Sequence, residues 1–158
     1  IPVATTRRES KTMLDLILAI THHLLVFGLV AMMMAGRVML SARPVPVMRL
    51  ARLDAGAGAL SGVVLAVGLS RAIWGGKGWA FYAENPFFWG KIGCFMLIGL
   101  LTVPGTIAFL KWRKAATADP AFQPDAAEAA RLRALTGVQA VVLIALLVCA
   151  AVMARWPF

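Results

Sequence analysis

Four long stretches of the chain are apolar and uncharged, and short polar segments rich in Arg, Lys, Pro and Gly separate them. The stretches cover residues 16–36, 55–70, 92–110 and 134–154. A bilayer core about 30 Å thick needs roughly 20 apolar residues in each helix that crosses it. Three of the stretches reach that length, and the second does so once its flanks are included. The pattern predicts an all-α protein, an integral membrane four-helix bundle.

Capping residues and proline set the expected helix boundaries. Asp15 lies three residues after Thr12, the spacing of a capping box, so the first helix is expected to begin there. Asn85 followed by Pro86 is an N-terminal signal for the third helix, and Asp125 is one for the fourth. The sequence thus predicts an N-terminal tail of residues 1–12 and one transmembrane domain of residues 13–158, with helices at about 13–41, 46–74, 86–114 and 126–155.

The segments that connect the predicted helices are short, and none is long enough to bury a hydrophobic core of its own. Composition agrees, because 61% of the 158 residues are hydrophobic and 15% are charged, whereas a soluble domain carries about 25% charged residues. Mean hydropathy is +0.81. These values exclude a water-soluble enzyme and a separate domain outside the membrane.

The net charge of +9 follows the membrane topology. The 16 Lys and Arg residues lie almost entirely at the ends of the apolar stretches, which is typical of contact with anionic headgroups and not of a nucleic-acid groove. Nine of them lie on the side of the first and third connections, and seven lie on the side of the two termini. The positive-inside rule therefore favours periplasmic termini. We expect the lipid bilayer as a partner and no nucleic acid.

The two histidines of the chain, His22 and His23, lie in the first predicted span. Polar side chains are costly inside a membrane, so each one there is a hypothesis about function. Imidazole is the usual axial ligand of haem and a common metal ligand. Adjacent helical residues point about 100° apart, so a monomer can direct only one of the two rings squarely into the bundle. The alternative is a structural histidine that hydrogen-bonds to a neighbouring carbonyl group.

Lys91 lies one turn into the third predicted helix. Its ammonium group could belong to a ligand site inside the membrane, or it could simply reach back to the membrane surface. Topology places further polar and aromatic residues in the same half of the membrane or in the loop above it: His22, His23, Arg71, Trp74, Lys77, Tyr82, Glu84, Asn85 and Trp89. An imidazole below several cations suits an amphipathic, anionic ligand such as haem, with its iron at a histidine and its propionates near Arg71, Lys77 or Lys91. Trp74, Tyr82 and Trp89 could equally form an interfacial aromatic belt that binds no ligand.

Other residues favour structural roles. The methionines at 32–34 resemble a copper-binding cluster, but consecutive helical residues face different directions and cannot chelate one ion together. Asp54 is expected to pair with Arg52 or Arg43 at the mouth of the second helix. Glycines along that helix are expected to let neighbouring helices approach closely, and they are Gly56, Gly58, Gly62 and Gly68. Nothing in the sequence supports a hydrolase or an ion-coupled transporter.

From about Leu14 to Ala154 the chain resembles a bacterial family of four-span membrane proteins of unassigned function, domain of unknown function 2214. The most specific segments are His22-His23-Leu24, Ala51-Arg52-Leu53-Asp54 with Gly56, Gly68-Leu69-Ser70-Arg71, Lys77-Gly78, Tyr82, Asn85-Pro86-Phe87-Phe88-Trp89-Gly90-Lys91, Pro104, Thr106 and Phe109-Leu110-Lys111-Trp112. The resemblance implies a multi-pass protein of a bacterial inner membrane.

The same pattern is more distantly similar to the HemJ-type protoporphyrinogen oxidases and to the CopD-like copper-resistance membrane proteins. HemJ-type enzymes bind haem b and depend on a histidine in helix 1 and a lysine in helix 3. The similarity implies that His23 (or His22) and Lys91 occupy those roles here. The chain departs from the HemJ pattern in its two adjacent histidines and in its longer, glycine-rich loop after the second helix, which puts the oxidase activity in doubt more than the haem site.

The sequence-based hypothesis is a haem-b-binding redox protein related in mechanism to HemJ. His23 is the expected axial ligand of the iron, Lys91 the expected catalytic residue near the iron or a propionate, and Arg71 the expected propionate clamp. Trp74, Tyr82 and Trp89 would complete the cofactor site. The sixth ligand position would be taken by Lys91, left empty or filled across the interface of a homodimer. The alternative is an accessory subunit, without chemistry of its own, that packs against a larger membrane complex; a copper permease finds less support.

Overall fold

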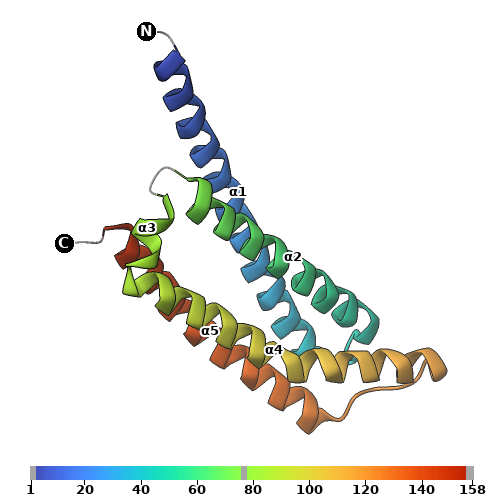
Figure 1. Ribbon diagram of the computed structural model, residues 1–158. Helices are drawn as coiled ribbons and strands as arrows, with labels where there is room; N and C mark the ends of the chain where they lie inside the picture. Colours follow the sequence, from blue (N-terminus) through green and yellow to red (C-terminus); the bar gives the residue numbers. More distant parts are fainter. Residues whose placement is uncertain (1–2, 76–77, 156–158) are drawn as a thin grey trace.

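The chain folds into five helices, four of them long and apolar enough to cross a membrane (Figure 1). The computed structural model describes residues 3–75 and 78–155, with side chains from residue 13 onward. The helices are α1 (Val3–Ser41), α2 (Val47–Trp74), α3 (Gly78–Ala83), α4 (Pro86–Ala118) and α5 (Ala126–Ala154). The described part of the chain contains no strand. The predicted all-α class and the four membrane-spanning helices are confirmed.

Helix α1 begins nine residues earlier than the capping signal at Thr12 predicts, at Val3 instead. Residues 3–12 contain neither proline nor glycine, so nothing in the sequence interrupts the helix there. Figure 1 shows this first part of α1, in dark blue, extending beyond the other helices. The expected role of Asp15 as a helix cap is wrong, because the residue lies well inside α1 and pairs with Arg71 of α2 instead.

The starts of α4 and α5 follow their sequence signals. The side chain of Asn85 accepts a hydrogen bond from the backbone N–H of Phe87 at 3.0 Å, and Pro86 occupies the first turn of α4. A carboxylate oxygen of Asp125 accepts a hydrogen bond from the N–H of Glu128 at 2.9 Å. Both caps satisfy backbone donors that the helix itself leaves free. Helix α4 continues to Ala118, one turn beyond the expected end at residue 114.

The short helix α3 lies in the connection between α2 and α4, where the sequence predicts a glycine-rich loop. Gly78 begins it with a φ of +74°, a left-handed conformation that favours glycine. Helix α3 turns the chain from α2 back toward the start of α4, and Tyr82 in α3 packs against Phe88 in α4. Part of this connection is therefore helical and packs against the start of α4.

The four long helices form two antiparallel pairs, α1 with α2 and α4 with α5. Figure 1 shows the pairs converging at the end of the α1–α2 and α4–α5 connections and diverging toward α3 and the C-terminus. It also shows α4 changing direction about midway along its length, where Pro104 interrupts the hydrogen-bond pattern. The larger buried cluster lies at the converging end and contains Leu40, Val45, Val47, Leu50, Ala51, Ala108, Phe109, Trp112, Ala129 and Leu132.

Large apolar side chains are exposed along all four spans. Examples are Phe27 on α1, Val63 on α2, Leu100 on α4 and Val141 on α5. A soluble protein rarely exposes apolar surface on this scale, whereas lipid tails solvate it readily. The exposed faces therefore support the expected contact with the lipid bilayer.

Candidate functional site

Ionisable side chains from three helices gather at the diverging end of the bundle. We call this group the polar cluster and define it as Asp15, His22 and His23 of α1, Arg71 of α2 and Lys91 of α4. His22 lies within electrostatic reach of Lys91, His23 and Arg71, and Lys91 lies within reach of Arg71. The structure thus brings together four residues that the sequence placed at one level of the membrane: His22, His23, Arg71 and Lys91.

His22 packs against the backbone of α2. Its Cε1 atom lies 3.1 Å from the position that a Cβ atom on Gly68 would occupy, so only glycine leaves room for the ring without a shift. The Nδ1 atom of His22 is buried and has no hydrogen-bond partner by geometry among the described residues, although the ring interacts with the backbone carbonyl of Val64 in α2. The ring of His23 lies 6.2 Å away, centroid to centroid, and nearly perpendicular to it. His22 is therefore the histidine in the α1–α2 interface.

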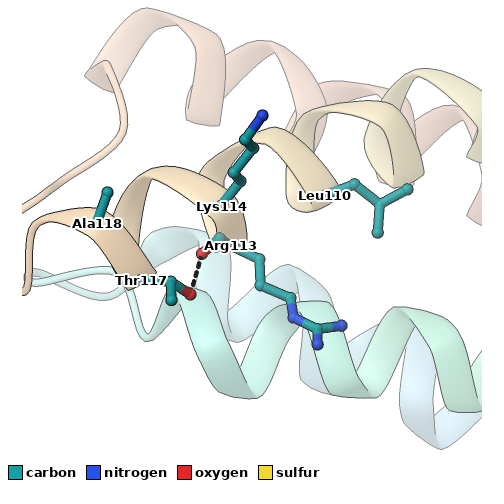
Figure 2. Close-up of a pocket in the computed structure, with 5 residues that line it drawn as sticks. All are labelled: Leu110, Arg113, Lys114, Thr117 and Ala118. Atoms are coloured by element: carbon teal, nitrogen blue, oxygen red, sulfur yellow. Dashed lines mark hydrogen bonds between the residues drawn. The ribbon is translucent and has the colours of Figure 1, made fainter.

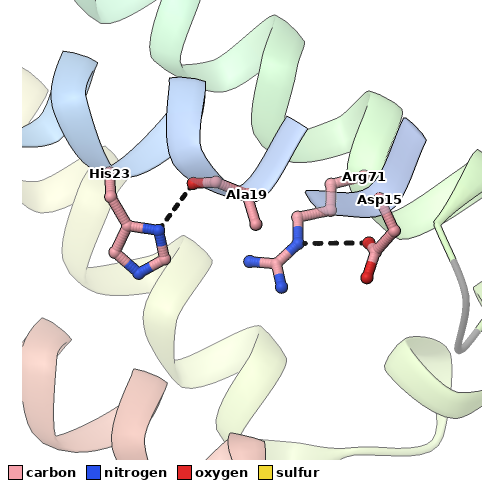
Figure 3. Close-up of polar contacts among 4 residues, drawn as sticks. All are labelled: Asp15, Ala19, His23 and Arg71. Carbon is pink, nitrogen blue, oxygen red and sulfur yellow. Dashed lines mark hydrogen bonds and ion pairs between the residues drawn. The ribbon is translucent and has the colours of Figure 1, made fainter. Parts of the chain in front are cut away.

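His23 is exposed and faces a different direction. Its Nδ1 atom lies 2.6 Å from the carbonyl oxygen of Ala19, one turn earlier in α1. A carbonyl oxygen can only accept a hydrogen bond, so Nδ1 carries the proton and the Nε2 lone pair of the neutral ring stays free. Figure 3 shows Nε2 directed away from α1, and the His23 ring and the Arg71 guanidinium on the same side of the two helices. A histidine that donates one N–H to a carbonyl and leaves the other nitrogen open has the arrangement common in metal ligation.

Arg71 and Asp15 link the C-terminal end of α2 to α1. The Nε atom of Arg71 lies 3.4 Å from Oδ1 of Asp15, and each side chain is about one third exposed, at 33% and 35%. The same Oδ1 atom lies 2.8 Å from where a Cβ atom on Gly75 would be, so the carboxylate occupies space that only glycine leaves free. Figure 3 shows the two terminal nitrogens of the guanidinium directed away from Asp15. Arg71 can therefore bind a second anion while it keeps this ion pair.

Tyr82 of α3 is buried beside the Asp15–Arg71 pair, with 9% of its surface exposed. Its ring packs on Phe88 at 5.5 Å between centroids. Burial raises the pKa of the phenol; Arg71 lowers that pKa and Asp15 raises it, so both charges act on the hydroxyl. The neutral phenol is the form that this environment favours.

The two tryptophans of the predicted site point outward. Trp74 is 63% exposed and Trp89 is 52% exposed, and the indole N–H of Trp89 donates to the carbonyl of Ala83 at 3.0 Å. This placement fits the alternative interpretation of both residues as interfacial aromatics. Glu84 is also exposed. Lys77, a predicted propionate partner, lies outside the described residues.

Helix α2 uses only some of its glycines for packing. A Cβ atom on Gly56 would lie 3.0 Å from Cε of Met32 in α1, and Gly68 meets His22 in the same interface. Gly58 and Gly62 have nothing within 4 Å of a Cβ position, so their expected packing role within the bundle is wrong. The methionine at 32 thus serves helix packing.

Asp54 interacts with a different partner from the one predicted. Its carboxylate hydrogen-bonds with the side chain of Thr106 in α4. Over residues 13–75 and 78–155, no ion pair joins Asp54 to Arg43 or Arg52. The contact ties α2 to α4 just outside the larger buried cluster, which makes Asp54 a structural residue in this fold.

Sequence reasoning missed a buried amide in the middle of the bundle. Gln139 of α5 is 7% exposed and donates from Nε2 to Oγ1 of Thr102 at 2.8 Å, with the carbonyl of Ile98 at 3.4 Å. It is the one amide side chain within the apolar stretch of residues 134–154. That feature could have marked it as an interhelical contact between α5 and α4.

A shallow hollow lies at the far end of α4 from the polar cluster (Figure 2). Its volume is about 430 Å³, and its lining comes from one helix face: Leu110, Arg113, Lys114, Thr117 and Ala118. The hollow opens outward and shares no residue with the predicted site. Among the described side chains, no three His, Cys, Asp or Glu residues lie close enough together to hold a metal ion.

Comparison with known families supports the membrane assignment and the resemblance noted in the sequence. A family model described as "Predicted membrane protein (DUF2214)" matches residues 14–156, which cover the four spans except Met13 and include the whole polar cluster. No curated protein and no solved structure matches the chain. The family description names no activity. The polar cluster is the group of residues that bears on function.

Proposed function

This chain belongs to the DUF2214 family of predicted membrane proteins, and we propose that it is an integral membrane protein that binds haem b for redox chemistry, with His23 as the axial ligand. The observation that carries the proposal is the hydrogen bond between Nδ1 of His23 and the carbonyl of Ala19. It fixes the tautomer that leaves Nε2 free for iron, and it holds the ring in one orientation. His22 is less suited, because its ring is packed on Gly68.

The charges around His23 suit an anionic, amphipathic ligand. Arg71 and Lys91 are two cations, whereas Asp15 is the one carboxylate of the polar cluster. An unbalanced cation is costly inside a membrane, and a ligand carboxylate would neutralise it. Haem b has two propionates on one edge and an apolar ring that matches the surrounding helix faces. We assign Arg71 as a propionate clamp and Lys91 to a position near the iron or the second propionate.

The protein's own groups would prepare the site in three ways. The Ala19 carbonyl orients the imidazole of His23. Asp15 holds Arg71 in place from the side opposite its terminal nitrogens. Tyr82, buried beside this pair, is a neutral hydrogen-bond donor at the edge of the polar cluster. Bound haem would supply one-electron chemistry, with a potential that the axial histidine and the nearby cations tune.

The absorption spectrum of protein purified in detergent, after expression with haem supplied, tests the proposal. We expect a Soret band, and an α band that sharpens in the reduced-minus-oxidised difference spectrum. Haem content measured on the same sample should approach one haem per chain. Protein that folds, runs as a single species and contains no haem would reject the proposal.

A second candidate function is that of an accessory subunit, or one half of a homodimer, without chemistry of its own. Gly58 and Gly62 favour it, since they lie four residues apart on an exposed face of α2, and no described residue comes within 4 Å of a Cβ atom placed on either of them. Small residues at this spacing let transmembrane helices approach closely. Gentle solubilisation followed by size analysis distinguishes the candidates. A haem-free protein that co-purifies with a larger membrane complex supports the subunit function, and a haem-loaded protein that runs alone opposes it.

A further inference from the structure

The hollow on the outer face of α4 has the chemistry of a lipid headgroup site, and we propose that it binds the phosphate of an anionic phospholipid. Its residues follow the helical spacing of a single face: Leu110, Arg113, Lys114, Thr117 and Ala118. The last turn of α4, beyond residue 114, provides Thr117 and Ala118. Figure 2 shows the side chains of Arg113 and Lys114 leaving adjacent positions of α4 in different directions, and both line the hollow.

The hollow lies just beyond the apolar part of α4. The uncharged stretch of α4 covers residues 92–110 and, followed along a helix that changes direction at Pro104, is about 28 Å long at 1.5 Å per residue. Arg113 and Lys114 follow three and four residues later, about 5 Å beyond the end of that stretch. Leu110, with 58% of its surface exposed, lies at the rim nearest the bilayer core and can contact an acyl chain.

The acidic side chains that follow α4 make no ion pair with Arg113 or Lys114 among the described residues. Asp119 accepts a hydrogen bond from the N–H of Ala121 at 2.9 Å, and Asp125 accepts one from the N–H of Glu128 at 2.9 Å. Glu128 in turn accepts from the indole N–H of Trp112 at 3.0 Å. Within residues 13–75 and 78–155, the ion pair that forms is Arg71–Asp15, at the opposite end of the bundle. No carboxylate lines the hollow.

The lining residues can share the recognition of a phosphodiester. The planar guanidinium of Arg113 can donate two parallel hydrogen bonds to phosphate oxygens, and Lys114 adds a mobile point charge. The Thr117 hydroxyl donates a hydrogen bond to the Arg113 carbonyl at 2.8 Å. This bond lies within the last turn of α4, beside the two cations. Free phosphate shares this chemistry. The position of the hollow just beyond the apolar part of α4 and its apolar rim at Leu110 favour the lipid as the source.

Lipid binding can be measured by native mass spectrometry of delipidated protein titrated with phosphatidylglycerol or phosphatidylcholine in neutral detergent micelles. We expect one phosphatidylglycerol to bind with clear preference over phosphatidylcholine. The variant Arg113→Gln/Lys114→Gln should bind it roughly 30-fold more weakly, the loss expected for two cations near an anionic surface. The control Lys111→Gln/Arg131→Gln removes the same charge from exposed positions outside the hollow and should weaken binding less than about threefold.

Several outcomes would overturn the proposal. Equal losses in the two double variants would mean that the positive charge attracts lipid diffusely. Equal binding of the two phospholipids would remove the role of the anionic headgroup, and displacement of the lipid by inorganic phosphate alone would make this a site for a free anion. If the double variant does not fold, the single variants Arg113→Gln and Lys114→Gln should each weaken binding about fivefold; unchanged binding in both would exclude the hollow as the site.

Discussion

The imidazole of His22 lies directly on α2, with its Cε1 atom 3.1 Å from the position that a Cβ atom on Gly68 would occupy. This contact is one of several that fix the rotation of α1 against α2, together with Met32 on Gly56 and Gly28 beside Leu60. Because consecutive helical residues point about 100° apart, His23 then faces the side where the Arg71 guanidinium projects. Gly68 thus provides the space in which His22 packs, while His23 lies on the open side of α1.

The first prediction concerns this packing. Gly68→Ala should lower the free energy of unfolding by about 1–3 kcal/mol, because the new methyl group would displace the His22 ring. The matched control is Gly58→Ala on the same helix, where a Cβ atom meets nothing within 4 Å. It should be neutral or stabilising by up to about 1 kcal/mol. Titration with SDS, followed by tryptophan fluorescence, measures both values; equal effects of the two substitutions would contradict the packing.

The second prediction concerns the Asp15–Arg71 ion pair. Asp15→Asn and Arg71→Gln should each destabilise the fold by about 1 kcal/mol, since each leaves a partly buried charge without its partner. The double variant should lose less than the sum of the two, with a coupling energy of at least about 0.5 kcal/mol. The same unfolding titration provides all four corners of this cycle. Strictly additive losses would show that the two side chains do not interact in the membrane.

The third prediction is a pH dependence at Tyr82, the single tyrosine of the chain. Its pKa is raised by burial, so the folded protein holds the phenolic proton more tightly than the unfolded chain does. The resulting stability is complete below the unfolded pKa of about 10 and is lost as the pH rises through the folded pKa. Because no other tyrosine contributes, the phenolate absorption band reports this residue alone.

Three variants test whether the phenolate transition belongs to Tyr82 and depends on its charged neighbours. Asp15 raises the pKa of Tyr82 and Arg71 lowers it, so Asp15→Asn should shift the phenolate transition to lower pH and Arg71→Gln should shift it to higher pH. Tyr82→Phe should abolish both the transition and its share of the alkaline loss of stability. A transition at the same pH in folded and SDS-unfolded protein would contradict the burial of this hydroxyl.

The fourth prediction concerns the buried amide between α4 and α5. Gln139→Leu should weaken the fold by about 0.5–2 kcal/mol, because Thr102 loses a partner at 2.8 Å. Thr136→Val is the control, since the Thr136 hydroxyl donates within its own helix to Leu132 at 3.1 Å and should matter less. Thermal unfolding in detergent compares the two; an equal or smaller loss for Gln139→Leu would argue against the interhelical bond.

The number of spans and most helix ends could be predicted because their causes are local. Apolar length decides which segments cross the membrane, and the caps at Asn85 and Asp125 bond to residues two or three positions away. The start of α1 could not be predicted from its local capping signal, because residues 3–12 contain nothing that stops a helix. Asp15 resembled a cap in the sequence, while its partner Arg71 lies in another helix.

The sequence could predict that four of the candidate residues lie near one another, but not how their side chains are oriented. Topology alone places His22, His23, Arg71 and Lys91 at one level of the membrane. Which histidine is free depends on contacts between helices, such as the space at Gly68, that no local pattern encodes. For the same reason, the sequence could not tell that Gly58 and Gly62, unlike Gly56 and Gly68, face away from α1.

The most direct test of the central claim compares the reduced-minus-oxidised absorption spectra of the His23→Ala and His22→Ala variants after expression with haem supplied. If His23 is the axial ligand, His23→Ala should lose the Soret and α bands of the folded wild-type protein and regain them when free imidazole is added, while His22→Ala should keep them. Bands that survive when His22→Ala and His23→Ala are combined, or that disappear only in His22→Ala, would contradict the assignment of His23.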